Sequence, residues 1–204
     1  MTDEYLSKRR MISYYNQVRI IRSLGKEVKT ILEIGIYNSL MSVLLTRNGY
    51  KVTTADANPE LKPDILLDLQ ADFDIPKETF DAIVLFQVLE HIPYEYFEKN
   101  LIKLADATKR FIVISIPCST VFFSSQFHTS FALTPRHFLI QLPKFWSSQP
   151  WTDEHYWEMG LKGYPKKRIV SSIKNVGLLI KREFQDPYHP YHYFFVLEKN
   201  PKLL

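Results

Sequence analysis

The segment at 81–86, with the sequence DAIVLF, is the feature that most constrains the fold, because it is almost entirely apolar. A strand that is apolar on both faces belongs in the middle of a parallel sheet that helices cover on both sides. Further short segments favour strands of the same sheet at 30–34, 50–55, 64–67 and 111–116. These runs predict a largely parallel central sheet.

Helical patterns alternate with these strands. At 5–24 apolar residues recur every three or four positions, and Gly25 follows as a stop signal. Segments 40–47 and 95–108 are also predicted helices, and Pro165 suits the first turn of another that ends before Gly177. The link at 57–63 is too short for a full crossover helix, so we expect a reduced turn there. The alternation predicts a Rossmann-like, doubly wound α/β fold.

Two more predicted strands, at 178–184 and 191–198, close the sequence, and only residues 185–190 join them. A connection this short cannot make a parallel crossover, so the pair must be antiparallel. We therefore predict a seven-stranded, mostly parallel sheet with an antiparallel last strand. This topology disfavours a plain dinucleotide-binding fold.

We expect a single domain over 1–204, with an N-terminal helical segment at 1–25 and a long aromatic-rich insertion at 117–164. Long insertions after a sheet strand are usually functional covers, so we interpret this one as a lid. The alternative interpretation is a helical elaboration that packs on itself.

The composition is that of an ordinary globular protein, with 46% hydrophobic and 24% charged residues, so disorder is excluded. The net charge of +4 permits a nucleic-acid partner without requiring one. The single cysteine, Cys118, excludes an intramolecular disulfide. No signal-peptide pattern and no run of about 18 apolar residues is present, so we expect a soluble, cytoplasmic protein without membrane association.

Acidic side chains follow three predicted strands, and ligands of open α/β sheets bind at the carboxyl ends of strands. Asp56 lies about 20 residues beyond the first turn, the expected distance for a carboxylate that accepts both hydroxyls of a ribose. Glu33 can face a ligand ammonium, and Asp68 can accept a hydrogen bond from an exocyclic amine. A cationic ligand with an adenosine end fits this set better than a pyrophosphate, although each carboxylate alone could simply cap a helix or face water.

Four successive motifs resemble those of class I S-adenosylmethionine-dependent methyltransferases: ILEIG at 31–35, TTAD at 53–56, FDAIV at 80–84 and VLEHIP at 88–93. The antiparallel last strand is a hallmark of that family. The block HYWE at 155–158, with KGYP at 162–165, resembles small microbial methyltransferases of the type-11-like group. The resemblance implies S-adenosylmethionine as cofactor and S-adenosylhomocysteine as product, and we expect the methyl acceptor to be a small molecule.

The resemblance also implies a cofactor site. Glu33 and Gly35 would hold the methionine part, Asp56 the ribose, and Asp68 with Leu69 the adenine, while Gln87 would line the pocket beside the reactive sulfur. The complete implied set is Tyr14, Tyr15, Glu33, Gly35, Tyr37, Asp56, Ala57, Asp68, Leu69, Gln87, Val88 and His91.

The glycine-rich run of the family is altered in this chain. Tyr37 and Ser39 occupy two positions where the family favours glycine, which tolerates positive φ and close approach of a ligand. We expect Asn38 to adopt the left-handed conformation and so preserve the turn.

The candidate catalytic residues are His155, His91 and Glu158, because a neutral acceptor often loses a proton as it attacks and histidine titrates in the useful range. His91 follows the fourth predicted strand, and His155 stands three residues before Glu158. If that stretch is helical, Glu158 shares a face with His155 and can orient its ring. We favour His155 as the base; the alternative that both histidines only brace loops stays open.

We expect no metal site. Glu90 and His91 are adjacent, and neighbouring side chains need not point the same way. No Cys/His spacing matches a zinc motif, and His189 and His192 are expected at a strand end or on the surface.

Three other functions remain as alternatives. An RNA methyltransferase would use the basic clusters at 8–10 and 166–168 to hold phosphates, although short charge runs are usually solvated. A degenerate methyltransferase-fold scaffold would bind without turnover. An NAD-linked dehydrogenase is disfavoured because the full glycine fingerprint is absent. The sequence leaves the acceptor and the oligomeric state open.

Overall fold

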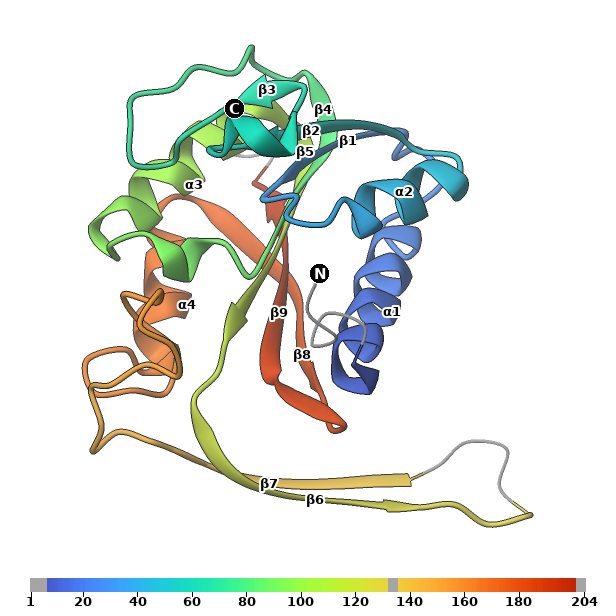
Figure 1. The fold of residues 1–204 in the computed structure, drawn as a ribbon, viewed down its shortest axis with the longest axis vertical. Coiled ribbons are helices and arrows are strands. Elements are labelled where there is room, and N and C mark those ends of the chain that lie inside the picture. The colour runs from blue at the N-terminus through green and yellow to red at the C-terminus, as the bar shows by residue number, and fades with distance from the viewer. Residues whose placement is uncertain (1–6, 132–135, 201–204) are drawn as a thin grey trace.

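The computed structural model describes residues 7–131 and 136–200, and a seven-stranded sheet forms its centre (Figure 1). The strand order is β3-β2-β1-β4-β5-β9-β8, and β9 runs antiparallel to both β5 and β8, whereas the other pairs in this sheet are parallel. The strands are β1 (Thr30–Ile34), β2 (Lys51–Asp56), β3 (Ile65–Leu66), β4 (Phe80–Phe86), β5 (Thr108–Pro117), β8 (Leu178–Asp186) and β9 (His189–Lys199). This arrangement confirms the predicted fold class, including the antiparallel last strand.

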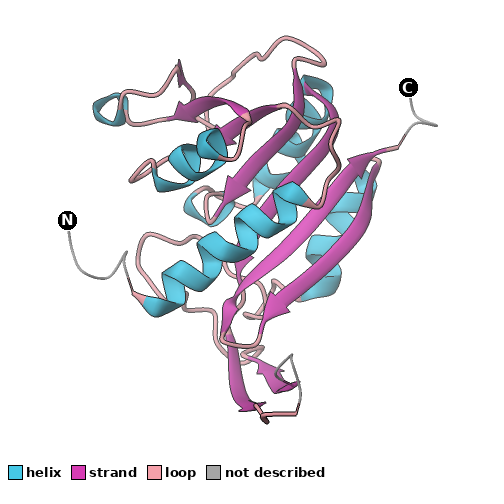
Figure 2. Ribbon diagram, turned by 90° about the vertical axis from the view of Figure 1, so that its right-hand side faces the viewer, coloured by secondary structure: helices cyan, strands magenta, loops and turns pink. Residues whose placement is uncertain are grey.

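Helices cover both faces of the sheet. In Figure 1, α1 (Lys8–Arg22) and α2 (Leu40–Arg47) lie on one side, and α3 (Glu95–Ala107) and α4 (Lys166–Asn175) lie on the other. Figure 2, turned by 90°, shows α1 running across the sheet. The doubly wound arrangement therefore follows from the predicted alternation of strands and helices.

The two apolar cores follow from the alternation of side chains along β1. Ile31 packs in the buried cluster that contains Ile20 of α1, whereas Leu32 packs in the cluster that contains Leu101 of α3. Successive side chains of a strand point to opposite faces. Glu33 therefore lies on the α1 face of the sheet.

The short connections also agree with the sequence. β3 has only two residues, and the link before it contains a single 3₁₀ turn, η2 (Pro59–Leu61), as its length predicts. α1 begins at Lys8 because the Ser7 hydroxyl accepts a hydrogen bond from the backbone N–H of Arg10 at 3.4 Å; residues 5 and 6 of the predicted helix lie outside the described chain. Within the described residues no helix is long and apolar enough to cross a membrane.

The structure divides the predicted insertion at 117–164 into two parts. The first part is an antiparallel hairpin of β6 (Thr120–Phe127) and β7 (Arg136–Pro143), which extends beyond the main sheet (Figures 1 and 2). Its apolar side chains are largely exposed, among them Phe122, Phe123, Phe127, Phe138, Ile140 and Leu142. The expected alternative of a helical elaboration is wrong, because the first part forms strands.

The second part of the insertion, 144–164, contains turns and packs against the main domain. Trp157 is completely buried among the residues of the α3-side core, and Met159 is buried beside it. The Trp157 indole N–H donates to the carbonyl of Ile92 at 3.1 Å. This part therefore belongs to the scaffold of the domain. Within the described part of the insertion, only the hairpin lies outside the core, as the predicted lid requires.

Candidate active site

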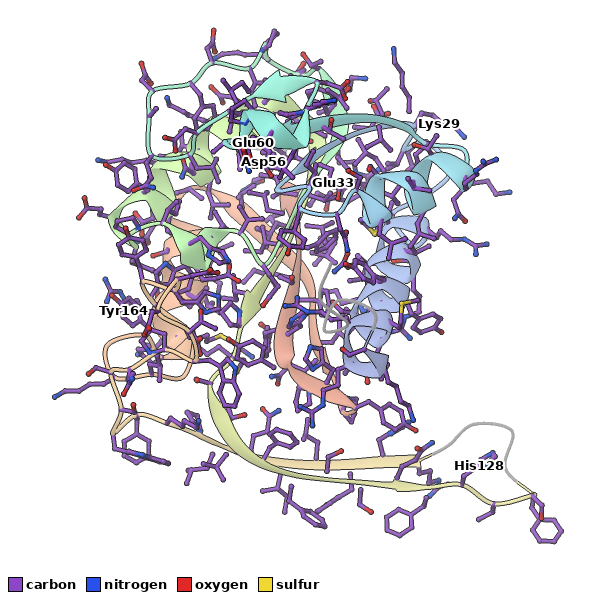
Figure 3. The ribbon with its side chains drawn as sticks, viewed as in Figure 1. Lys29, Glu33, Asp56, Glu60, His128 and Tyr164 are labelled. Carbon is purple, nitrogen blue, oxygen red and sulfur yellow. The ribbon has the colours of Figure 1, made fainter. Side chains whose placement is uncertain are left out.

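The carboxyl ends of β1, β2 and β4 meet at one edge of the sheet. Ile34 of β1 lies in register with Ala55 of β2 on one side and Leu85 of β4 on the other. The chain places β2 and β3 on one side of β1 and then returns to place β4 on the other side. The end of β1 is therefore the topological switch point, where open α/β sheets bind ligands. Figure 3 labels Glu33 and Asp56, which come from β1 and β2, at this edge.

Asp56 links the two loops that leave β1 and β2. One carboxylate oxygen accepts the backbone N–H of Ile36 at 2.9 Å, and the other accepts that of Asn58 at 2.9 Å. The sequence predicts a carboxylate that faces a ligand and water; the structure adds a role in holding the two loops. The next residue, Ala57, is exposed at the same edge.

Gly35 has a physical requirement for glycine. Its φ is +84°, and a Cβ at this position would lie 2.3 Å from Cγ2 of Val88. Its backbone N–H donates to the carbonyl of Ala55 at 2.9 Å. Glycine therefore lets the first loop turn and lets Val88, another residue of the implied cofactor set, approach the backbone.

The altered glycine-rich loop adopts left-handed backbone without glycine. Tyr37 has a φ of 24° and Ser39 a φ of 55°, whereas Asn38 is not among the described residues with positive φ, so the expected rescue by a left-handed Asn38 is wrong. Asn38 instead accepts the backbone N–H of Leu40 at 3.2 Å and donates its amide to the Tyr14 hydroxyl at 3.1 Å. Asn38 thus caps α2 and attaches the loop to α1.

The two tyrosines of α1 are placed differently. Tyr14 reaches the first loop through Asn38. Tyr15 is 62% exposed, and its ring lies 5.6 Å from the guanidinium carbon of Arg19 on the outer side of the helix. The structure therefore brings Tyr14 to the predicted pocket and does not bring Tyr15 there.

Glu33 is an unusual residue at this edge, because its carboxyl group is buried. Its side chain is only 4% exposed, and its Oε2 has no hydrogen-bond partner within the described chain. Burial raises the pKa of Glu33 to about 8. A buried carboxylate without a partner is costly, and a cationic ligand group would relieve that cost.

The remaining predicted cofactor residues lie at the ends of β3 and β4. Asp68 is exposed and accepts the backbone N–H of Gln70 at 2.8 Å, whereas the side chain of Leu69 is buried in the α3-side core. Gln87 has a φ of 59° and donates its backbone N–H and its side-chain amide to Ser115 at 3.0 and 3.2 Å. Left-handed backbone at a residue other than glycine is concentrated at functional sites.

Glu90, His91 and His155 form a cluster that the sequence did not predict. One potential metal-ligating atom from each of the three lies within 4.8 Å of the other two. Glu90 and His91 belong to a 3₁₀ turn, η3 (Leu89–His91), and the backbone N–H of Tyr156 donates to the Glu90 carbonyl at 2.8 Å. Neighbouring side chains need not point the same way, but here the tight turn brings potential ligand atoms of both Glu90 and His91 close to His155.

The side chains of this cluster have unusual surroundings. Glu90 is completely buried and neither carboxylate oxygen has a partner among the described residues; burial raises its pKa to about 8. The rings of His91 and His155 meet edge to face with centroids 4.8 Å apart. Partial burial lowers the pKa of His91, and the neighbouring His155 lowers it further.

Glu158 holds His155 as predicted, although the stretch between them is not helical. Its Oε1 lies 2.8 Å from Nδ1 of His155 and also accepts the N–H of Trp151 and the hydroxyl of Tyr191, each at 2.8 Å. Its Oε2 accepts the hydroxyl of Ser119 at 2.7 Å. Burial by itself would raise the pKa of Glu158, but these hydrogen bonds outweigh it and lower the pKa.

Two features lie apart from this site. His192, expected at a strand end or on the surface, is buried in β9 with its Nδ1 2.7 Å from the Ser13 hydroxyl. A largely apolar cavity of about 420 Å³ lies at the base of the hairpin, and its lining includes Cys118, Met159 and Tyr193. Among the described residues, none of the implied cofactor set lines it.

Comparison with known proteins agrees with this geometry. A family model described as a methyltransferase domain matches residues 5–161, and no curated protein matches the sequence. Magnesium protoporphyrin IX methyltransferase from Synechocystis PCC 6803, solved with bound S-adenosylmethionine, is similar in structure, with a TM-score of 0.60, 14% identity, and coverage of 94% of this chain and 80% of that chain.

Two further structures are similar. For 1,6-didemethyltoxoflavin-N1-methyltransferase from Burkholderia thailandensis, solved with 1,6-didemethyltoxoflavin and S-adenosylhomocysteine, the TM-score is 0.62, the identity 10%, and the coverage 92% of this chain and 78% of that chain. For an S-adenosylmethionine-dependent methyltransferase from Clostridium acetobutylicum ATCC 824, the TM-score is 0.60, the identity 10%, and the coverage 92% of each chain. The chain therefore belongs to the methyltransferase-domain family and has the fold of the class I S-adenosylmethionine-dependent methyltransferases.

Proposed function

We propose that this protein binds S-adenosylmethionine at the ends of β1, β2 and β4 and transfers its methyl group to a small-molecule acceptor. The observation that carries the proposal is the buried carboxylate of Glu33, one oxygen of which has no hydrogen-bond partner among residues 7–131 and 136–200, near Gly35 and Asp56 at the switch point of the sheet. The ammonium group of S-adenosylmethionine supplies the cation that this carboxylate lacks.

The other residues then have separate tasks. Asp56 accepts the ribose hydroxyls, Asp68 the adenine amine, and Tyr14 closes the pocket from α1. Gln87 and Val88, which follow β4, adjoin the sulfonium. Bound S-adenosylmethionine would supply an electrophilic methyl group to the acceptor and leave as S-adenosylhomocysteine, and His155, our candidate base, would take up the proton that the acceptor loses. The protein contributes alignment and a matched electrostatic environment.

A small-molecule acceptor is favoured over RNA by two observations. Two structurally similar proteins are named as methyltransferases of magnesium protoporphyrin IX and of 1,6-didemethyltoxoflavin, which are small ring compounds. The basic cluster at 166–168 is partly engaged within the protein: Lys166 pairs with Glu183 at 2.5 Å, and the Arg168 guanidinium lies 4.3 Å from the Tyr94 ring centre. Cations engaged in this way are less available to phosphates.

Isothermal titration calorimetry with S-adenosylhomocysteine tests the proposal, and we expect one site per chain. Because the pKa of Glu33 is raised to about 8, most of this group is protonated near pH 7 in the free protein. An ammonium bound beside it lowers that pKa, so binding should release most of one proton. The released proton appears as a difference in heat between buffers of different ionisation enthalpy.

Two controls make this measurement specific to Glu33. As the pH rises through about 8, more of the Glu33 carboxylate is already ionised in the free protein, so its proton release on binding should decrease. Glu33→Gln should abolish the release near neutral pH and weaken binding. Failure to detect S-adenosylhomocysteine binding at millimolar ligand would favour the scaffold alternative, and salt-dependent RNA binding would favour the RNA methyltransferase.

A further inference from the structure

We propose that Glu90, His91 and His155 bind a divalent transition-metal ion. The three side chains offer one carboxylate and two imidazoles, and the potential ligand atoms lie within 4.8 Å of one another. Ligands at about 2.0–2.2 Å from one zinc ion are themselves about 3–4 Å apart. The separations of up to 4.8 Å must therefore shorten by about 1 Å for all three atoms to bind one ion.

The state of Glu90 is an independent reason to place a cation here. This carboxylate is completely buried, and neither oxygen has a hydrogen-bond partner in the part of the chain that the structure describes. Buried polar groups are nearly always paired, so an unpaired carboxylate with two imidazoles nearby needs an explanation. A metal ion would coordinate the Glu90 carboxylate and both imidazoles at the same time.

The contacts of His155 leave its Nε2 atom available to bind a metal ion. Glu158 is buried and ionised, so we assign the Nδ1 hydrogen of His155 to the 2.8 Å hydrogen bond between them. The lone pair is then on Nε2, and the ring is held in one orientation. Metal-binding histidines almost always have such a carboxylate or carbonyl behind them. Glu158 is therefore a positioning residue for the metal site.

The ligand types indicate the class of ion. Two imidazoles with one carboxylate suit Zn²⁺, Mn²⁺, Fe²⁺ or Co²⁺, whereas Mg²⁺ and Ca²⁺ prefer oxygen ligands alone. Three protein ligands also leave coordination positions open for an oxygen of another molecule. His91 follows β4 closely, so those positions lie near the proposed methyl group; this placement, unlike the metal site itself, rests on the proposed function.

The metal and the general base are alternative uses of His155. A metal ion on Nε2 takes the lone pair with which the imidazole would accept a proton. With the ion bound, its positive charge would favour loss of a proton from an acceptor hydroxyl. Metal titration therefore distinguishes the two roles of this side chain.

The test uses the full chain, freed of any histidine tag, treated with a chelator and titrated with Co²⁺ and Zn²⁺ without S-adenosylmethionine. We expect one ion per chain, seen by calorimetry for Zn²⁺ and by visible absorption for Co²⁺. His155→Ala and Glu90→Gln should each lower the affinity about 100-fold or more, and Glu158→Gln about 10–100-fold. Glu158→Asp should restore part of the loss if the carboxylate acts by holding His155.

His189→Ala is the matched control, because His189 and His192 form another close imidazole pair, with ring centroids 4.3 Å apart. This variant should bind both ions as the parent does. Absence of binding by the folded parent, or unchanged affinity in Glu90→Gln and His155→Ala, overturns the proposal, as does loss of binding in His189→Ala. If His155→Ala fails to fold, His91→Ala replaces it. S-adenosylhomocysteine titration of each sample, followed separately, reports on the proposed function alone.

Discussion

At the scale of single residues, the first loop and the end of β2 are held together before any ligand binds. The Asp56 carboxylate accepts two backbone N–H groups, one from Ile36 after β1 and one from Asn58. A residue that the sequence predicts for ribose binding therefore also shapes the loop that surrounds the ribose. Its loss should affect both folding and binding.

Asp56→Ala should weaken S-adenosylhomocysteine binding by about 2 kcal/mol, because hydrogen bonds to a charged group are the strong ones. The same change should lower the free energy of unfolding by about 1–3 kcal/mol, since two backbone donors lose their acceptor. Calorimetry and chemical denaturation measure the two effects. Asp68→Ala is the comparison: its carboxylate accepts one exposed backbone N–H, from Gln70, so its effect on stability should be smaller. An Asp56→Ala protein that is folded and keeps full affinity would remove Asp56 from the site.

The second residue-scale prediction concerns His155. With an acceptor in hand, His155→Ala should lower the turnover rate about 100-fold or more and leave S-adenosylhomocysteine affinity nearly unchanged. The reason is that His155 belongs to the cluster around Glu90 and not to the loops after β1 and β2. Steady-state kinetics and calorimetry provide the two readouts. Full turnover in this variant would exclude a catalytic role, and an equal loss of cofactor affinity would place His155 in the cofactor pocket.

At the scale of elements, the insertion is two structures with different energetic roles. The hairpin of β6 and β7 contacts the main domain at the β8–β9 turn, where the Ser124 hydroxyl donates to the Pro187 carbonyl at 2.8 Å and the rings of His137 and Tyr188 lie 4.8 Å apart. The stretch at 144–164 instead contributes Trp157 to the core. We therefore expect that the hairpin can be deleted without loss of the fold, whereas the stretch at 144–164 cannot.

Replacing residues 121–142 with Gly-Gly tests this division. Thr120 and Pro143 lie opposite each other in the hairpin ladder, so two residues can join them. We expect cooperative thermal unfolding and unchanged S-adenosylhomocysteine affinity, because the predicted cofactor residues lie on other elements. By contrast, Trp157→Ala should lower the free energy of unfolding by about 3–5 kcal/mol. Loss of cofactor binding by a folded hairpin deletion would show that the hairpin belongs to the cofactor site.

At the scale of the whole molecule, the sheet separates the two apolar cores and leaves its switch-point edge for ligands. The strands β4 and β5 are almost completely buried between helices, whereas the hairpin lies beyond the edge of the sheet and exposes most of its side chains. Stability should therefore decrease from the centre of the sheet toward the hairpin.

Hydrogen exchange measured by mass spectrometry should show this gradient. In the free protein, amides at 120–143 should exchange faster than those of β4 and than those around Trp157, because few buried contacts protect the hairpin. Addition of S-adenosylhomocysteine with an acceptor should slow exchange in the hairpin if it closes over the acceptor. Equal protection with and without ligands would make the hairpin a fixed part of the scaffold.

The sequence by itself determined the sheet and the positions of the residues that follow its strands. Apolar runs identify strands because burial on both faces requires them, and the short link at 185–190 requires an antiparallel pair. Glu33, Gly35 and Asp56 could be located because each stands at the end of such a run, where parallel strands bring their carboxyl ends to one edge. These features depend on local patterns and on one topological rule.

Only the tertiary structure decided which distant side chains meet. The aromatic-rich segment has no clear hydrophobic period. The sequence alone therefore could not show that its first part forms a hairpin with exposed rings, or that Trp157 in its second part is buried. The convergence of Glu90 and His91 on His155 depends on the 3₁₀ turn after β4 and on the docking of 144–164 against it. Local sequence sets the secondary structure, but the approach of segments far apart in the chain is set by packing, and this cluster exists only because of that packing.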